Sequence, residues 1–214
     1  MFGFWNKKTE IRGEIGYFGL QDWWLSTFSK AERDHIENIF RPMGSDPNSN
    51  PLTEGEITWT SQTAVSLLSS LAGWFNNPQD REIAKKIIDK AWGLATNCEN
   101  VLDYHFTLHQ KMEIYYRERE SSSQALEIAI NACREQIELA PQAAKAFLKE
   151  YPEDTLPAHA GYSQLRIILE KQGKYDEAIV LCEKAKQQKW AGNWDKQIET
   201  LNKKKAKARI ASQE

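Results

Sequence analysis

The chain has 214 residues, of which 41% are hydrophobic and 11% aromatic, and its formal net charge is -2. This amount of apolar material can form a core, which excludes general disorder. The near-neutral charge argues against a general nucleic-acid binder, because such proteins carry a basic excess that neutralises phosphates. We therefore expect an ordinary globular protein of one large domain or two small ones.

Residues 1–57 differ in pattern from the rest of the chain, and we expect them to form a small N-terminal extension. Apolar residues alternate with others over 11–17, which is the period of a short half-buried strand. Ile57 and Trp59 can supply the partner strand. This pairing predicts a short two-stranded element near the N-terminus.

A capping box predicts one helix inside the extension. Ser29 is followed three residues later by Glu32, and the apolar residues after them have helical spacing, so we expect a helix over 29–41. Three of the seven prolines lie in the following loop, 42–51, which is the best candidate for a domain boundary. The second domain is accordingly predicted to span 58–214.

From about residue 60 to the end of the chain, the apolar residues recur with the period of a helix. Serines, prolines and glycines divide this region into successive helices, and Pro141 is expected to begin a short helix of its own. The predicted helices cover about 65–75, 78–92, 101–116, 123–140, a short segment from 141, and then 157–172, 175–188 and 194–211.

This helical region contains a repeated pattern. Its last copy, 159–192, reads Tyr162-x2-Leu165-Arg166-x2-Leu169, then Gly173 and Tyr175, then Ala178-x3-Cys182-x2-Ala185. Weaker copies occupy 65–98 and 106–139, and all three share an alanine, three residues, a core residue, two residues and a second alanine. The pattern resembles the tetratricopeptide (TPR) repeat, whose small residues on the second helix let its hairpin partner approach closely. Glu113 and Arg166 depart from the family, which prefers small residues there.

The resemblance implies an all-α fold of TPR-like stacked helical hairpins, an α-α superhelix, following the small irregular or helical N-terminal extension. Such stacks expose a concave surface, lined by the first helix of each pair, that typically binds a protein or peptide. The alignment places on this surface Asn76 with Ser66, Ser69 and Gly73 from the first copy, Gln110, Ile114 and Arg117 with Thr107 from the second, and Ser163, Ile167 and Glu170 from the third.

Two of these residues bear on the kind of peptide that would bind. Some TPR proteins hold a C-terminal carboxylate with a Lys and an Asn at the positions of Ser163 and Ile167, so binding of a chaperone tail is disfavoured. Arg117 is the cation that we expect to anchor a partner by hydrogen bonds.

The adjacent indoles of Trp23 and Trp24 allow two interpretations. If they lie in a strand or turn they point to different sides, and both can be buried between the N-terminal extension and the first hairpin. Alternatively they form an exposed anchor for a partner, because Trp is enriched at binding hot spots. The same choice applies to Phe2, Phe4 and Trp5.

The sequence contains few residues in catalytic or metal-binding patterns. His105 and His109 are one helical turn apart, but the sequence has no HExxH motif and no cysteine nearby, so we predict no metal site. Gly13, Gly16 and Gly19 do not form a phosphate-binding motif, and no nucleophile elbow is present. We therefore predict no cofactor and no enzymatic activity.

Basic residues concentrate in the last helix, over 203–209. TPR-like stacks need a polar closing helix, and cations near a helix C-terminus complement its dipole, so we favour a capping role over nucleic-acid binding. No apolar run approaches the roughly 18 residues of a membrane-spanning helix. The widely spaced cysteines form no CxxC pair, which favours reduced thiols in the cytoplasm.

The sequence thus predicts a cytoplasmic, non-enzymatic adaptor or regulatory subunit that binds protein or peptide, and neither nucleic acid nor membrane. One alternative is a self-associating scaffold that forms a homodimer through its apolar N-terminal segment. Another is a small-ligand sensor or enzyme with a site between the N-terminal segment and the first hairpin. The residues expected around that site are Trp23, Trp24, Arg33, His35 and Trp59.

Overall fold

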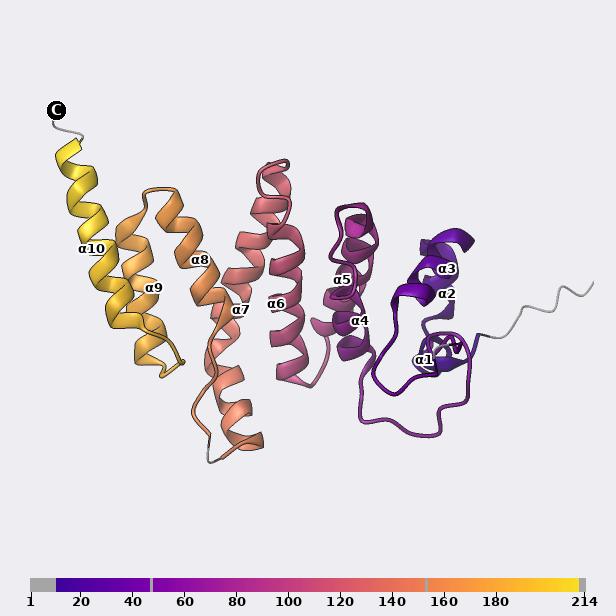
Figure 1. Cartoon of the computed structure of the whole chain (residues 1–214). Helices are drawn as coiled ribbons and strands as arrows, with labels where there is room; N and C mark the ends of the chain where they lie inside the picture. The colour runs from indigo at the N-terminus through magenta and orange to yellow at the C-terminus, as the bar shows by residue number, and fades with distance from the viewer. Residues whose placement is uncertain (1–10, 47, 153, 212–214) are drawn as a thin grey trace, which may run out of the picture. The chain divides into compact units, whose positions relative to one another are not determined.

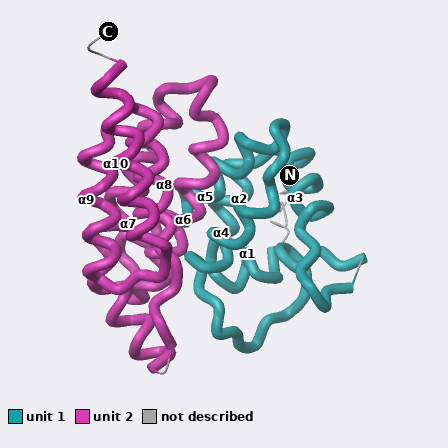
Figure 2. The backbone as a smooth tube through the Cα atoms, turned by 60° about the vertical axis from the view of Figure 1, so that its left-hand side comes forward, with its two compact units in different colours: residues 1–91 teal, residues 92–214 magenta. Residues whose placement is uncertain are grey.

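The computed structural model describes residues 11–46, 48–152 and 154–211. These residues form helices and no strands, which confirms the predicted all-α class (Figure 1). The chain divides into two compact units, Met1–Ala91 and Trp92–Glu214 (Figure 2). Phe2, Phe4 and Trp5 lie outside the described residues.

The N-terminal unit contains α1 (Gly13–Tyr17), α2 (Gln21–Thr27), α3 (Lys30–Ile39), α4 (Ala64–Ala72), the 3-10 turn Pro78–Asp80, and the greater part of α5 (Arg81–Ala95). Helix α3 begins where the capping box predicts. The Ser29 side chain accepts a hydrogen bond from the Glu32 backbone N–H, and the Glu32 carboxylate accepts one from the Ser29 N–H. Both exposed backbone donors are thereby satisfied.

The strand predicted over 11–17 is wrong, because this segment forms α1. Its first N–H groups donate to carbonyls of a loop about forty residues later in the chain. Gly13 donates to Gly55, and Ile15 donates to Leu52 at 2.9 Å. Gly13 has φ +57°, and a Cβ on it would lie 2.5 Å from the Pro51 carbonyl oxygen, so only glycine fits here.

The core of this unit joins α1, α2 and α3 to the helices that follow. Its fully buried large side chains are Ile15, Trp24, Phe28, Ile36, Leu52, Leu67, Leu68, Leu71, Phe75 and Ile87. Polar contacts also connect α3 to later parts of the chain: Lys86 pairs with Glu32 at 2.8 Å, and His35 pairs with Asp80 at 2.8 Å. The unit therefore extends past the boundary that the sequence suggested after residue 57.

The C-terminal unit contains α6 (Val101–Tyr116), α7 (Ser123–Glu150), α8 (Ala160–Lys171), α9 (Tyr175–Gln187) and α10 (Trp194–Ala211). Each of these helices packs against the next one in the chain. Small residues line these contacts: Ala132, Ala140, Ala143, Ala178 and Ala185 are buried in the core. Packing of neighbouring helices through small residues is what the repeated alanines predict.

Helix α7 runs through Pro141, so the predicted break at this residue is wrong. Proline removes one backbone hydrogen bond from a helix and normally kinks or ends it. Here Pro141 is exposed, while Ile137, Ala140 and Ala143 on the other side are buried. Burial of this continuous apolar stripe keeps the helix intact on both sides of the proline.

Helix α10 packs along α9 and buries Trp194 and Leu201. Two of its lysines form ion pairs with earlier helices: Lys204 with Glu170 of α8, and Lys205 with Asp176 at the start of α9. Part of the basic charge of the C-terminal helix is thus neutralised within the unit.

Candidate functional site

The predicted concave residues of the second and third repeat copies lie in the C-terminal unit, and those of the first copy lie in the N-terminal unit. Gln110 and Ile114 share one face of α6, which Arg117 follows directly at its C-terminal end, and Ser163, Ile167 and Glu170 recur along one face of α8. Helices α6 and α8 contact each other, so the structure brings these two sets into the same unit. Ile114 is buried, while the other five are half-buried.

Glu170 is already engaged within the unit. One carboxylate oxygen accepts from Arg166 at 2.7 Å, and the other pairs with Lys204 of α10. A partner that used Glu170 would have to replace these two cations. Asn76 lies in the N-terminal unit, where its exposed side chain donates to the Gly73 carbonyl at 2.7 Å.

Trp23 and Trp24 lie on helix α2 and not in a strand or turn. Successive helical residues point about 100° apart, so adjacent side chains face different surroundings. Trp24 is 1% exposed and belongs to the core of the N-terminal unit, which excludes it as an exposed anchor. Trp23 is half-buried, and its ring packs edge-on against Phe28 with centroids 5.4 Å apart.

An apolar groove that the sequence did not predict lies on the C-terminal unit. We call it the α7–α9 groove, because α7 and α9 form its sides and α8 contributes Leu165 and Leu169. Its volume is about 510 Å³. It is lined by Arg134, Ile137, Glu138, Leu165, Leu169, Asp176, Glu177, Val180, Leu181 and Lys184.

Val180 is the residue of this groove that most indicates a docking surface. It is 59% exposed, although its neighbours at 178 and 182 on the same helix are fully buried. The repeat pattern identifies the buried side of α9, and Val180 lies on the opposite side. An apolar residue on the outer side of α9 was the available signal for a docking surface.

The two histidines of α6 differ in burial. His105 is buried, whereas His109 is half-exposed and lies 3.4 Å from Glu113. No group of three or more metal-binding side chains occurs in the described part of the chain. His105 instead packs in an aromatic cluster with His159 and Trp190.

The buried aromatic cluster is held by a buried amide. Gln136 of α7 donates to the His105 carbonyl at 2.8 Å and accepts from the Gly161 N–H at 2.6 Å. Burial lowers the pKa of His105 to about 4 and that of His159 to about 3. Both rings are therefore neutral near pH 7, and the arrangement is that of a core contact between α6, α7 and α8.

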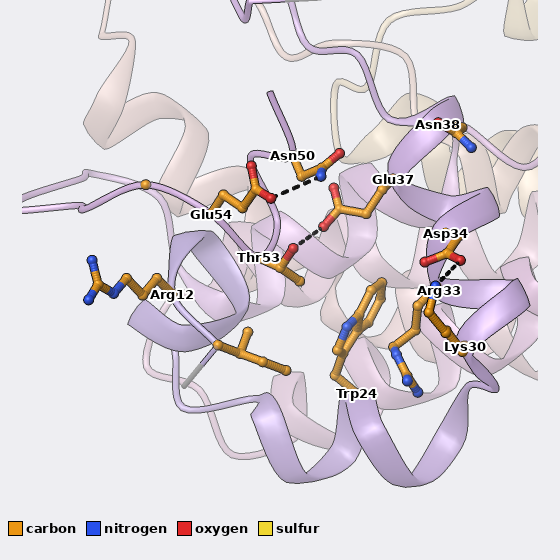
Figure 3. A pocket seen from close by; sticks show the side chains of 12 residues that line it. Arg12, Trp24, Lys30, Arg33, Asp34, Glu37, Asn38, Asn50, Thr53 and Glu54 are labelled. Atoms are coloured by element: carbon orange, nitrogen blue, oxygen red, sulfur yellow. Dashed lines mark hydrogen bonds and ion pairs between the residues drawn. The ribbon is translucent and has the colours of Figure 1, made fainter. Parts of the chain in front are cut away.

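The N-terminal unit contains a polar cavity of about 820 Å³ (Figure 3). Trp24 and Arg33, two of the residues expected around a ligand site, line it. His35 and Trp59 do not: His35 pairs with Asp80, and Trp59 is largely exposed elsewhere on the unit. The cavity lies within residues 11–55, which places it earlier in the chain than the sequence suggested.

Comparison of the chain with protein-family models, with curated proteins and with solved structures finds no match. Among the described residues, no helix combines the length and the apolar character that crossing a membrane requires. The groove and the cavity are therefore the features from which a function can be inferred.

Proposed function

We propose that the protein is a non-enzymatic protein-interaction module with TPR-like stacked hairpins, and that its C-terminal unit binds a second copy of the chain through the α7–α9 groove. The observation that carries this proposal is the groove itself: an apolar floor, a charged rim and an exposed valine on one helix. Apolar surface bordered by charged residues is typical of protein interfaces.

The packing of the C-terminal unit supports the TPR-like part of the proposal. Helices α6 to α9 pack one after another around a core that includes buried alanines, and α10 follows as the last helix. Its ion pairs connect it to Glu170 of α8 and Asp176 of α9. This arrangement agrees with the role that the resemblance gives to the last helix.

The rim charges favour a second copy as the occupant. The sides of the groove carry two cations, Arg134 and Lys184, and three anions, Glu138, Asp176 and Glu177, of which Asp176 already pairs with Lys205. A two-fold axis brings a surface patch against itself, so the cations of one copy can face the anions of the other. Val180 at the centre of the patch can then enter the apolar groove of the other copy.

The size of the contact sets the expected strength. The segment of α9 from Glu177 to Lys184 spans two helical turns, or about 10 Å. An interface centred on so short a segment falls at the small end of the range for specific complexes, so we expect a dissociation constant in the micromolar range.

Sedimentation velocity of the full chain, from about 1 µM to about 1 mM, tests this association in the range where micromolar complexes dissociate. The wild type should change from monomer to dimer with concentration. Val180→Glu should stay monomeric, because the groove would have to bury an unpaired charge. Ile210→Glu is the matched control, since Ile210 is equally exposed but lies on α10, outside the groove.

A charge exchange tests the orientation. Lys184→Glu and Glu177→Lys should each weaken self-association, and mixing the two variants should restore it, because opposite charges then meet again. A wild type that is monomeric at every concentration would overturn the proposal, as would a dimer that Val180→Glu leaves intact.

The face of α6 predicted from the repeat supplies a second control. The double variant Gln110→Ala, Arg117→Glu leaves the α7–α9 groove unchanged, so its dimer should have wild-type strength. Loss of the dimer in this variant alone would move the interface to the α6 face and refute the assignment to the groove.

A further inference from the structure

The polar cavity of the N-terminal unit has an acidic wall. Figure 3 shows Glu37 of α3 near Glu54 and Asn50 of the loop that caps α1. The Asn50 amide donates to Glu54 at 3.2 Å, and the Thr53 hydroxyl donates to one oxygen of Glu37 at 2.6 Å. Contacts between α3 and this loop thus fix the position of the carboxylates.

Glu37 is the distinctive residue of this wall. It is only 7% exposed, and its second carboxylate oxygen, Oε2, is buried without a hydrogen-bond partner. A buried acceptor that lacks a partner costs about 1 to 3 kcal/mol, and more when it is charged. A ligand that donates a hydrogen bond to Oε2 would remove this cost.

The electrostatic surroundings favour a positively charged donor. Glu14 also has a buried oxygen without a partner. Burial raises the pKa of Glu14, and the charge of Glu37 raises it further. Burial also raises the pKa of Glu37; hydrogen bonds from Thr53 and the Leu52 backbone act against this rise, and the charge of Glu54 adds to it. A bound cation would relieve both the burial and the repulsion.

Three basic residues, Arg12, Lys30 and Arg33, line the cavity, and the last two are engaged with other groups. Lys30 pairs with Asp34 at 2.6 Å, and Arg33 donates to the Phe28 carbonyl. Arg41, whose charge lowers the pKa of Glu37 slightly, donates to backbone carbonyls that include that of Ser49. None of these cations has a hydrogen bond to the free oxygen of Glu37.

We propose that this cavity binds a small organic cation whose ammonium or guanidinium group donates to Oε2 of Glu37 and is paired with Glu54. The carbon chain of the ligand would occupy the rest of the cavity, whose lining also includes Asn38 and Asn50 (Figure 3). Carboxylates that accept charge-assisted hydrogen bonds are the chemistry that recognises ammonium and guanidinium groups. A metal ion is a poorer fit, since the described residues contain no metal-binding group of three.

Isothermal titration calorimetry of the full chain with agmatine, which carries an ammonium and a guanidinium group, tests this proposal. Butylamine is the second probe, and 1-butanol and butyrate are the neutral and anionic controls of the same carbon length. Saturable binding of the two cations and not of the controls is the expected result. Absence of saturable binding of both cations up to about 10 mM, beyond the range of useful small-ligand affinity, overturns the proposal.

Variants locate the site. Glu37→Gln should weaken agmatine binding about 10- to 100-fold, the loss expected for one charge-assisted hydrogen bond. Glu56→Gln is the matched control, because Glu56 lies just past the same loop, is exposed and does not line the cavity. Equal affinity of Glu37→Gln and wild type would refute the role of Glu37.

Should Glu37→Gln fail to fold, which circular dichroism would show, a second variant keeps the test decisive. Glu54 is exposed, so Glu54→Gln is expected to fold normally. It should still weaken agmatine binding several-fold, because it removes the second anion. Unchanged affinity in this variant would exclude the paired carboxylates as the binding site.

Discussion

The buried histidines predict that acid destabilises the C-terminal unit. An unfolded histidine takes up a proton near pH 6.5, whereas His105 does so only near pH 4 and His159 only near pH 3 in the folded state. Between these values the unfolded state binds more protons than the folded state. Stability must therefore fall as the pH decreases from about 7 toward 4.

The size of the effect follows from the pKa differences. Below the unfolded pKa, each such histidine lowers the free energy of unfolding by about 1.4 kcal/mol per pH unit. Integrated from about pH 7.5 to about pH 5, this amounts to about 2 kcal/mol for each histidine and about 4 kcal/mol for the pair. A loss of this size is a large fraction of the stability of a typical domain.

Urea unfolding followed by circular dichroism at the two pH values measures this loss. His105→Gln and His159→Asn remove the titrating groups, and Asn can keep the capping bond that His159 accepts from the Tyr162 N–H. Each variant should reduce the difference between the two pH values by about 2 kcal/mol, whatever its absolute stability.

Two outcomes would contradict this prediction. If both buried-histidine variants lose as much stability between the two pH values as the wild type does, the histidines are not the source of the acid sensitivity. If the wild type itself shows no loss, the rings are not held neutral by burial.

Glycine substitutions give further predictions, each measured by urea or thermal unfolding. Gly13→Ala should destabilise the N-terminal unit by about 2 to 4 kcal/mol, because φ is positive and the new Cβ meets the backbone of the capping loop; Gly19→Ala, with positive φ and open space around it, should cost only about 1 to 2. Gly161→Ala should cost about 1 to 3 kcal/mol, since its Cβ would lie 2.8 Å from the Gln136 side-chain oxygen. Gly93→Ala, on a helix with no atom near the new Cβ, should stabilise by up to about 1 kcal/mol, and a loss there would contradict the helix assignment.

Local sequence signals predicted most of the helices. The capping box at Ser29 and the helical periods over 101–116 and 175–188 correspond closely to α3, α6 and α9. These signals involve residues within one or two helical turns of each other, so they predict a helix without knowledge of the tertiary contacts. The class of fold follows from them directly.

The two wrong predictions of secondary structure depend on distant or opposing forces. The segment 11–17 forms a helix in spite of its alternating pattern. The backbone N–H groups at its N-terminus donate to carbonyls of a loop around residues 51–55. Pro141 is a local stop signal, but the buried stripe of α7 on either side outweighs it. Neither the remote loop nor the strength of the packing is visible in a short window of sequence.

The candidate sites were harder to predict, for the same physical reason. The repeat alignment identifies residues that should face a groove, but it does not show that Lys204 occupies Glu170 or that Trp24 enters the core. In the α7–α9 groove Val180 stays 59% exposed, and in the cavity Thr53 binds only one oxygen of Glu37. Whether an atom stays exposed or without a hydrogen-bond partner depends on how the whole unit packs.

The two units should respond to pH in opposite directions. In the N-terminal unit, burial raises the pKa of Glu14 and Glu37, so above the ordinary carboxyl pKa the folded state binds more protons than the unfolded state. These groups stabilise that unit as the pH falls, while His105 and His159 destabilise the other one. Lowering the pH from neutral to about 5 should therefore separate unfolding into two steps, with the C-terminal unit unfolding first. Hydrogen exchange monitored by mass spectrometry can assign the steps, and earlier loss of protection in α2 and α3 than in α6 and α8 would show the opposite order.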